Sequence, residues 1–203
     1  MENNDFSSAQ SAPSFSGSKG GTHLALSHNI WGSKVTSLSF NGDVVLDTIE
    51  IDEPSLNSQL KSLNITGNSA LQRLLLHSVT GEAMTSVNYF FGGTYAIEEI
   101  YMPVFTKAVR DTSADDKAHQ NVRTVDLRSF NAPFIFQTLP KQAVNLEWID
   151  ISNMDLQYFE GEYEKDWIFG TIHDDCFILV KNNDVKNKLE ELNPNLTRIQ
   201  VIR

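Results

Sequence analysis

One spacing of apolar residues recurs along this chain and limits the folds open to it more than any other feature. In each copy, an apolar residue is followed by two more, three and five positions later. The five clearest copies are Leu60-Leu63-Ile65, Leu71-Leu74-Leu76, Ile97-Ile100-Met102, Val122-Val125-Leu127 and Leu146-Ile149-Ile151. From Leu71 onward the copies begin 26, 25 and 24 residues apart, a period at which similar units stack into a solenoid. The spacing therefore predicts a β-rich solenoid, and a non-solenoid α+β fold with alternating strands is the alternative.

Charge and cysteine content exclude several classes of function. The 203 residues include 16 basic and 26 acidic side chains, so the net charge of -10 disfavours a nucleic-acid partner or an anionic membrane surface. The single cysteine, Cys176, excludes an internal disulfide framework and a four-cysteine zinc site. Because Asp174 and Asp175 precede Cys176, we expect a buried structural thiol and not a nucleophile.

The two ends of the chain carry different signals. Residues 1–22 are rich in Ser, Gly, Asn and Gln, which predicts a flexible arm or attachment segment. The first residues lack a basic and an apolar region, so no secretory signal is predicted, and no apolar run is long enough to span a bilayer. These features fit a cytoplasmic protein, a component of a particle such as a virion, or a secreted or cell-surface protein that has lost its leader.

The segment 23–54 contains two short alternating runs, 35–40 and 46–51, on either side of Asn41-Gly42-Asp43. Because Asn-Gly readily adopts the positive φ of a tight turn, these runs predict a β-hairpin that covers the open end of a solenoid. Near the other end, Asn183 or Asp184 is expected to cap a helix over 185–192, which Asn193-Pro194 ends.

Residues 55–203 resemble a known repeat family. The stretch from Leu60 to Leu76 is similar to a bacterial leucine-rich repeat with an Asn-containing corner at Asn68, and 90–100 resembles the BspA-type variant, in which an aromatic residue and Gly precede the next strand. The tail, 175–202, resembles the strand, helix and strand that close such arrays. The resemblance implies a short, irregular leucine-rich-repeat array of α/β class and a role in adhesion or protein interaction.

Outward positions of the predicted strands form a candidate recognition face. Between inward Leu71, Leu74 and Leu76, alternation turns Arg73, Leu75 and His77 outward. Aligning the copies stacks these positions in three rows, namely Arg73, Glu99, Thr124 and Trp148, then Leu75, Tyr101, Asp126 and Asp150, then His77, Pro103, Arg128 and Ser152. The candidate partner-binding residues are Arg73, Leu75, Glu99, Tyr101, Asp126, Arg128, Trp148 and Asp150, since these rows contain Tyr, Trp and Arg, which are enriched at binding hot spots.

Other patterns point less clearly to chemistry. The acidic and aromatic stretch 158–167 matches no calcium loop, and His173 has no second histidine nearby in the sequence for a metal site. The chain also lacks a nucleophile elbow, a phosphate-binding loop and a zinc-protease motif. We therefore expect a non-catalytic module without cofactor or metal that binds a protein, or less favourably a glycan. The alternative is a structural component of a larger assembly, such as a bacteriophage tail or head decoration, docked by residues 1–22.

Overall fold

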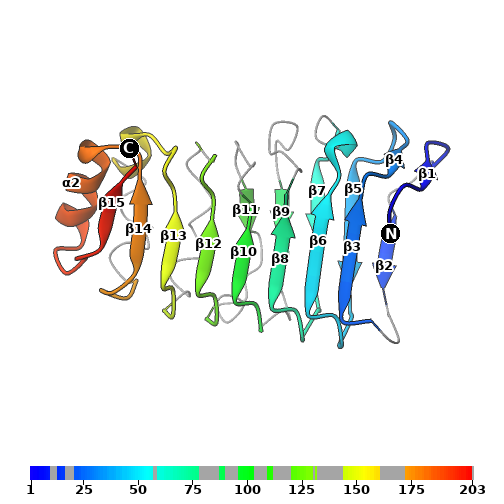
Figure 1. Cartoon of the computed structure of the whole chain (residues 1–203), viewed down its shortest axis with the longest axis horizontal. Coiled ribbons are helices and arrows are strands. Elements are labelled where there is room, and N and C mark those ends of the chain that lie inside the picture. Colours follow the sequence, from blue (N-terminus) through cyan, green and yellow to red (C-terminus); the bar gives the residue numbers. More distant parts are fainter. Residues whose placement is uncertain are drawn as a thin grey trace.

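The computed structural model describes most of the chain. The described residues are 1–9, 13–16, 21–56, 59–77, 87–89, 96–102, 109–111, 120–129, 131, 144–160 and 172–202. They form a strand-rich β-solenoid in which every strand pair is parallel (Figure 1). Within this part of the chain, no helix has the length and apolar character needed to cross a bilayer.

One wall of the solenoid is an eight-stranded sheet, here called the long sheet. Neighbouring strands in it are one coil apart in the sequence, so each coil contributes one strand. From the N-terminal edge to the C-terminal edge, its strands are β3 (His23–Ser27), β6 (Thr48–Asp52), β8 (Arg73–Leu76), β10 (Glu99–Tyr101), β12 (Thr124–Asp126), β13 (Trp148–Asp150), β14 (Phe177–Val180) and β15 (Ile199–Val201).

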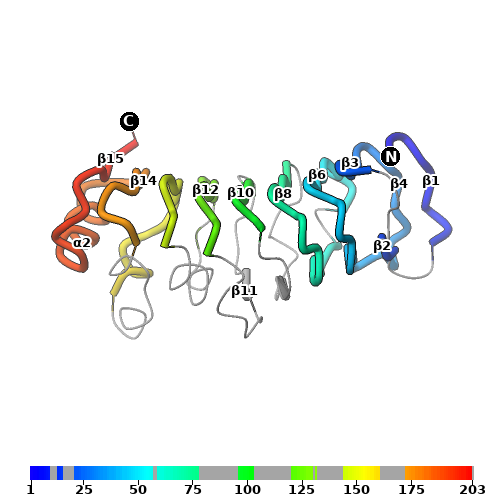
Figure 2. Tube along the Cα trace, turned by 90° about the horizontal axis from the view of Figure 1, so that it is seen from below, coloured from blue at the N-terminus to red at the C-terminus, as the bar shows by residue number. Residues whose placement is uncertain are grey.

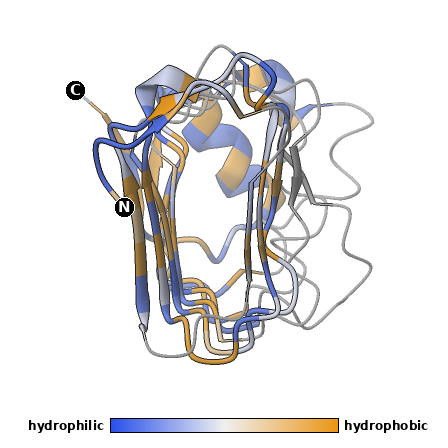
Figure 3. Ribbon diagram, turned by 90° about the vertical axis from the view of Figure 1, so that its right-hand side faces the viewer, coloured by the Kyte–Doolittle hydropathy of each residue, from blue (hydrophilic) through white to orange (hydrophobic). Residues whose placement is uncertain are grey.

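The opposite wall is built from two smaller sheets. It contains a three-stranded sheet of β2 (Ser14–Ser16), β5 (Ser37–Asn41) and β7 (Ser62–Asn64), and a pair formed by β9 (Val87–Tyr89) and β11 (Val109–Asp111). The chain alternates between the walls, passing from β5 to β6 and from β7 to β8. Figure 2 shows β2 and β11 on the side away from the long sheet, and Figure 3 shows the two walls end-on.

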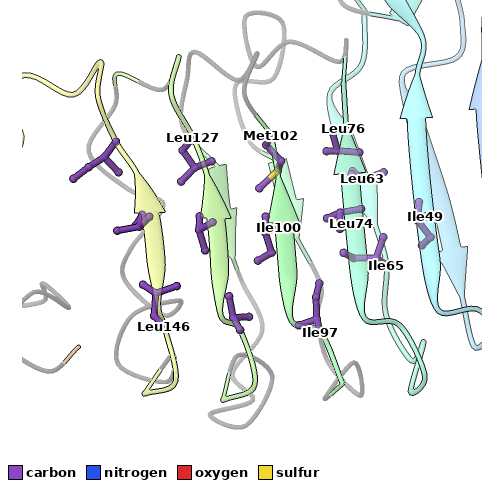
Figure 4. Packing of buried hydrophobic residues seen from close by; sticks show 14 of the residues in the cluster. Ile49, Leu63, Ile65, Leu74, Leu76, Ile97, Ile100, Met102, Leu127 and Leu146 are labelled. Atoms are coloured by element: carbon purple, nitrogen blue, oxygen red, sulfur yellow. The ribbon is translucent and has the colours of Figure 1, made fainter. Parts of the chain in front are cut away.

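The core lies between the walls and consists of the residues that the recurring spacing marks. All fifteen side chains of the five clearest copies are at most 2% exposed. Successive coils place like residues side by side, as in the register Ile49–Leu74 and Leu74–Ile100 (Figure 4). Burying an aliphatic side chain of this size stabilises the fold by roughly 1.5–3 kcal/mol. The burial of all fifteen side chains confirms the sequence prediction of the inward positions.

The structure corrects the expected hairpin over 35–51. The two runs lie in different walls, because β5 pairs with β7 whereas β6 pairs with β3 and β8. Gly42 does adopt a positive φ of 68°, and Gly67, in the next coil, has a φ of 74°. Both residues form the corner between the walls, so the turn directs the chain across the solenoid and does not fold it back on itself. The copies that begin at Leu60 and Leu71 are likewise the two walls of one coil.

A buried polar contact fixes the same corner in two successive coils. Asn68 is fully buried, and its amide donates to the carbonyls of Ile65 in its own coil at 2.7 Å and Phe40 in the preceding coil at 2.6 Å. Its Oδ1 accepts from the backbone N–H of Asp43 at 3.2 Å, while Asp43 accepts from Leu46 N–H at 3.0 Å. Asn68 therefore fills the corner position that the sequence predicted for it.

The C-terminal end has the expected strand, helix and strand. Helix α2 (Asn183–Leu192) lies between β14 and β15 in the chain, and Val185 and Leu189 face the core. Its N-cap is Asn182, whose side chain accepts from Val185 N–H at 3.0 Å, so the cap lies one residue before the expected position. Figure 3 shows α2 across the space between the walls, where it covers the last coil.

The N-terminal residues differ from the expected flexible arm where the structure describes them. Strand β1 (Asp5–Phe6) pairs with β4 (Ile30–Trp31), and β2 pairs with β5. The rings of Phe6 and Trp31 stack at 4.9 Å between centroids, and those of Phe15 and Phe40 at 5.1 Å. These residues pack on the first coils because their aromatic rings have apolar partners there. Two short 3-10 helices, η1 (Pro54–Leu56) and η2 (Leu156–Phe159), complete the described elements.

Candidate recognition face

The first two outward rows form with the predicted alignment. Glu99 is in register with Arg73 and Thr124, and Thr124 with Trp148. In the second row, Tyr101 is in register with Leu75 and Asp126, and Asp126 with Asp150. In the third row, His77, Arg128 and Ser152 lie just beyond the strands, whereas Pro103 is outside the described residues. The regular period of the inward positions is what made this alignment readable from the sequence.

The rows differ in exposure, which corrects part of the candidate site. Arg73 is exposed, and Glu99 and Trp148 are half-buried. In the second row, however, Leu75 is 8%, Asp126 3% and Asp150 5% exposed. Tyr101 is half-buried, as are the residues in register at either end of the row, Glu50 and Leu179. Leu75, Asp126 and Asp150 therefore offer little surface to a partner.

The two buried aspartates are occupied by local hydrogen bonds. Asp126 Oδ1 accepts from Arg128 N–H at 3.2 Å, and Asp150 Oδ1 accepts from Ser152 N–H at 2.9 Å, so each carboxylate forms the turn at the end of its strand. The Arg128 guanidinium also contacts Asp126, with Nε 3.1 Å from Oδ1 and Nη2 2.5 Å from Oδ2. This hydrogen bond raises the pKa of Arg128 above its usual value. Arg128 thus presents an exposed cation held in place by a buried carboxylate.

The first row has an ion pair near one end and two aromatic residues in register near the other. Arg73 Nε lies 3.0 Å from Glu99 Oε2, and both side chains are partly exposed. At the other end, Trp148 is in register with Phe177, and the Arg198 guanidinium lies over the Phe177 ring, 5.5 Å from its centroid. Phe177 and Arg198 extend the row beyond the residues that the sequence reasoning selected. The spacing between Cys176, Ile178 and Val180 could have placed Phe177 outward.

A second cluster lies at the N-terminal end of the long sheet. One carboxylate, that of Glu50 on β6, contacts His23 Nε2 on β3 at 3.1 Å and His77 Nε2, just after β8, at 2.8 Å. The His77 ring packs at 5.2 Å from the Tyr101 ring. Glu50 was not selected from the sequence, although it lies outward between Ile49 and Ile51, and Leu46, Ile49 and Ile51 have the recurring spacing.

No described element packs against the outer surface of the long sheet. The contacts between elements are those of neighbouring strands, of α2 with η2, β14 and β15, and of β4 with η1. In the end-on view, the outside of this wall carries no second layer of described residues (Figure 3). Of the acidic and aromatic stretch, residues 161–167 lie outside the described part of the chain.

The chemistry at Cys176 is that of a structural thiol. Its side chain is buried, and burial raises the pKa of Cys176 to about 12, with a further upward contribution from Glu147 and an opposing one from Arg198. A thiol with this pKa is protonated at neutral pH and is a poor nucleophile. Among the described residues, no cluster of three His, Cys, Asp or Glu side chains is arranged to hold a metal ion.

Comparison with known proteins adds no relative. Searches against protein-family models, curated proteins and solved structures each found no match. The fold and the outward rows of the long sheet are therefore the basis for considering function.

Proposed function

We propose that this protein is a non-catalytic recognition module that binds a protein partner through the outer face of the long sheet. The contact residues in this proposal are Arg73, Glu99, Tyr101, Arg128 and Trp148. A relationship to BspA-type leucine-rich repeats, with a role in adhesion or protein interaction, is part of the proposal.

The observation that supports the proposal is the arrangement of two aromatic and two arginine side chains in aligned rows. Tyr101 and Trp148 lie on β10 and β13, two strands apart in the long sheet, with β12 between them. Arg73 lies on β8, next to β10, and Arg128 follows β12, between the two aromatic residues; each guanidinium is held by a neighbouring carboxylate. Side chains that are already positioned lose less conformational entropy on binding. Tyr, Trp and Arg are also the residue types that dominate binding energy at interfaces.

The alternative, a structural component of a larger assembly docked by residues 1–22, stays a prediction. The described residues of this segment pair with β4 and β5 of the first coils. No contact in the described part of the chain favours a docking role for them over a role in closing the N-terminal end.

The test is quantitative affinity capture from the native source with the double variant Tyr101→Ala/Trp148→Ala. We expect the captured protein to fall by at least about tenfold, because loss of two interface aromatics removes several kcal/mol of binding energy. The matched control is Ser37→Ala/Lys61→Ala on the opposite wall, which should leave capture unchanged.

Stability measurements separate a lost contact from a lost fold. The double variant should lose less unfolding free energy than Ile100→Ala, a fully buried site on β10 where truncation costs about 2–5 kcal/mol. A captured set that is the same for the double variant and the wild type would contradict the proposal. A partner lost only on deletion of residues 1–22 would favour the assembly role.

A further inference from the structure

An open hollow of about 680 Å³ lies where the chain enters the strands of the long sheet, beside the candidate recognition face. Its lining comes from five successive coils, with Glu98, Arg123 and Glu147 immediately before β10, β12 and β13, Asp175 shortly before β14, and Arg198 immediately before β15. None of the eight residues selected for the candidate recognition face lines this hollow. Its volume is within the range typical of small-molecule sites.

The backbone fixes the floor of the hollow. Arg123 N–H donates to the Glu98 carbonyl at 2.8 Å, and Glu147 N–H donates to the Arg123 carbonyl at 2.8 Å. In the next coil, Phe177 N–H donates to the Glu147 carbonyl at 2.8 Å. The side chains of these stacked residues are therefore presented at the regular spacing of the strands, about 4.8 Å.

The lining carries one more carboxylate than guanidinium. Arg123 forms an ion pair with Glu147, with Nε 3.1 Å from Oε1, and this hydrogen bond raises the pKa of Arg123. Arg198 donates to the backbone carbonyl of Asp175 at 3.1 Å. Three carboxylates and two guanidiniums line the hollow in a chain of net charge -10, so the site offers no excess positive charge to an anionic ligand.

The remaining groups suit a ligand that is uncharged and rich in hydroxyl groups. Asn121 and Asn145 contribute carboxamides from adjacent coils, and the Asn145 amide donates to the Gln120 carbonyl at 2.7 Å, which orients its Oδ1. Carboxamide and carboxylate oxygens accept hydrogen bonds from hydroxyl groups. Val144 is 52% exposed and provides one apolar surface, against which the C–H groups of a sugar ring can pack. A wholly apolar ligand would instead leave the polar lining without hydrogen-bond partners.

The hollow continues along the solenoid. A second, smaller depression of about 260 Å³ shares Glu98, Arg123 and Glu147 with it and extends to Gln72 and Arg73 at β8. Together they follow the stacking direction of the coils, so equivalent polar positions recur about every 4.8 Å. This period is close to the length of one sugar unit in an extended glycan, whereas an extended peptide advances only about 3.3 Å per residue.

We propose that this groove binds a linear, neutral glycan, with successive sugar units in step with successive coils. The inference does not rest on the proposed protein-recognition function, although the smaller depression includes Arg73 and Glu99. It assigns to the chain a second site with a different class of ligand.

The test is isothermal titration of the full chain with four neutral probes, namely cellohexaose, maltohexaose, xylohexaose and chitohexaose. A galacturonic acid hexamer and a pool of unstructured synthetic peptides serve as the charged and peptide comparisons. We expect saturable binding of at least one neutral probe and weaker binding of the charged hexamer and the peptides. Absence of binding by all four neutral probes, or equal binding of the peptides, would overturn the proposal.

Variants locate the site. Glu98→Ala/Asn145→Ala removes hydrogen-bonding groups from the hollow and should lower the affinity for the probe that the wild type binds by at least about tenfold. The matched control Asn153→Ala/Glu190→Ala makes the same two substitutions at exposed positions elsewhere and should change the affinity by less than about twofold. Tyr101→Ala/Trp148→Ala should retain glycan binding, so failure of this proposal and failure of the protein-recognition proposal give different results. Equal affinities of the wild type and the hollow variant would refute the location.

Discussion

Two asparagines make the same kind of contact in different surroundings. Asn68 donates to the Phe40 carbonyl of the preceding coil at 2.6 Å, and Asn153 donates to the Ser129 carbonyl of the preceding coil at 3.1 Å. Asn68 is fully buried at a corner between the walls, whereas Asn153 is exposed. Water can replace the partner of Asn153 but not the partners of Asn68. Equivalent contacts between coils therefore differ in what they contribute to stability.

The same contrast distinguishes two glutamates. Glu53 is fully buried, and its Oε2 accepts from Asn29 N–H at 2.9 Å while its Oε1 accepts from the Asn29 side chain. Glu50 lies on the outer face, contacts His23 and His77, and has a side chain that is 33% exposed. In a solenoid each coil contacts only its neighbours, so buried polar contacts of this kind align one coil with the next.

Asn68→Ala should have the largest effect of the changes that test this comparison. It leaves the carbonyls of Phe40 and Ile65 and the N–H of Asp43 without their side-chain partner in a buried corner, which we expect to cost roughly 3 kcal/mol. Asn153→Ala should cost less than about 0.5 kcal/mol. Urea denaturation gives the difference, and hydrogen exchange should show faster opening in 35–76. Similar losses for both variants would remove the distinction between buried and exposed contacts.

Glu53→Gln should have an intermediate effect. Both carboxylate oxygens of Glu53 accept hydrogen bonds from Asn29, so a carboxamide would place its own N–H groups against one of these donors. We expect a loss of about 2 kcal/mol. The control is Glu50→Gln, which should change the unfolding free energy by less than about 1 kcal/mol. If thermal unfolding ranks the two variants in the opposite order, burial is not the deciding factor.

Asp155→Asn should have the smallest effect, and one that depends on pH. Hydrogen bonds from Lys181, at 2.5 Å, and from Asn131 lower the pKa of Asp155 below its ordinary value of 3.8. A carboxyl group whose pKa is lower in the folded state stabilises the fold at any pH above its unfolded-state pKa. This stabilisation is lost as the pH falls through the folded-state pKa. Because the pair of Asp155 and Lys181 is partly exposed, we expect the unfolding free energy of the wild type to exceed that of the variant by less than about 1 kcal/mol at neutral pH. The difference should shrink between about pH 5 and pH 3, measured by urea denaturation; a constant difference would contradict this account.

The inward positions and the alignment of the outward rows could be predicted because both follow from period alone. An inward residue such as Leu74 recurs at Ile100 and Val125, and the residues on either side must alternate in direction. No pairing partner had to be known to reach this result. The capped helix near the C-terminus was predicted for a similar reason, since its cap and its apolar positions are local.

The hairpin over 35–51 and the accessibility of the second row could not be predicted in the same way. Alternation shows that β5 and β6 are strands, but an Asn-Gly turn serves equally to join strands of one sheet or to pass between two walls. Which of these two turns forms depends on β7, the partner of β5, which belongs to the next coil. Asp126 and Asp150 appeared to be available for binding, yet their turns and neighbouring coils cover them.

The sequence by itself determined the coil length, the residues of the core and the order of the outward rows, because a repeated apolar spacing requires stacked, equivalent strands. Only the tertiary structure decided which residues on those rows reach solvent and which polar groups are enclosed at the corners. It also decided that Glu98, Arg123 and Glu147 line a hollow. These outcomes depend on contacts between residues one coil apart, and a spacing in one dimension does not record what lies beside a residue in three.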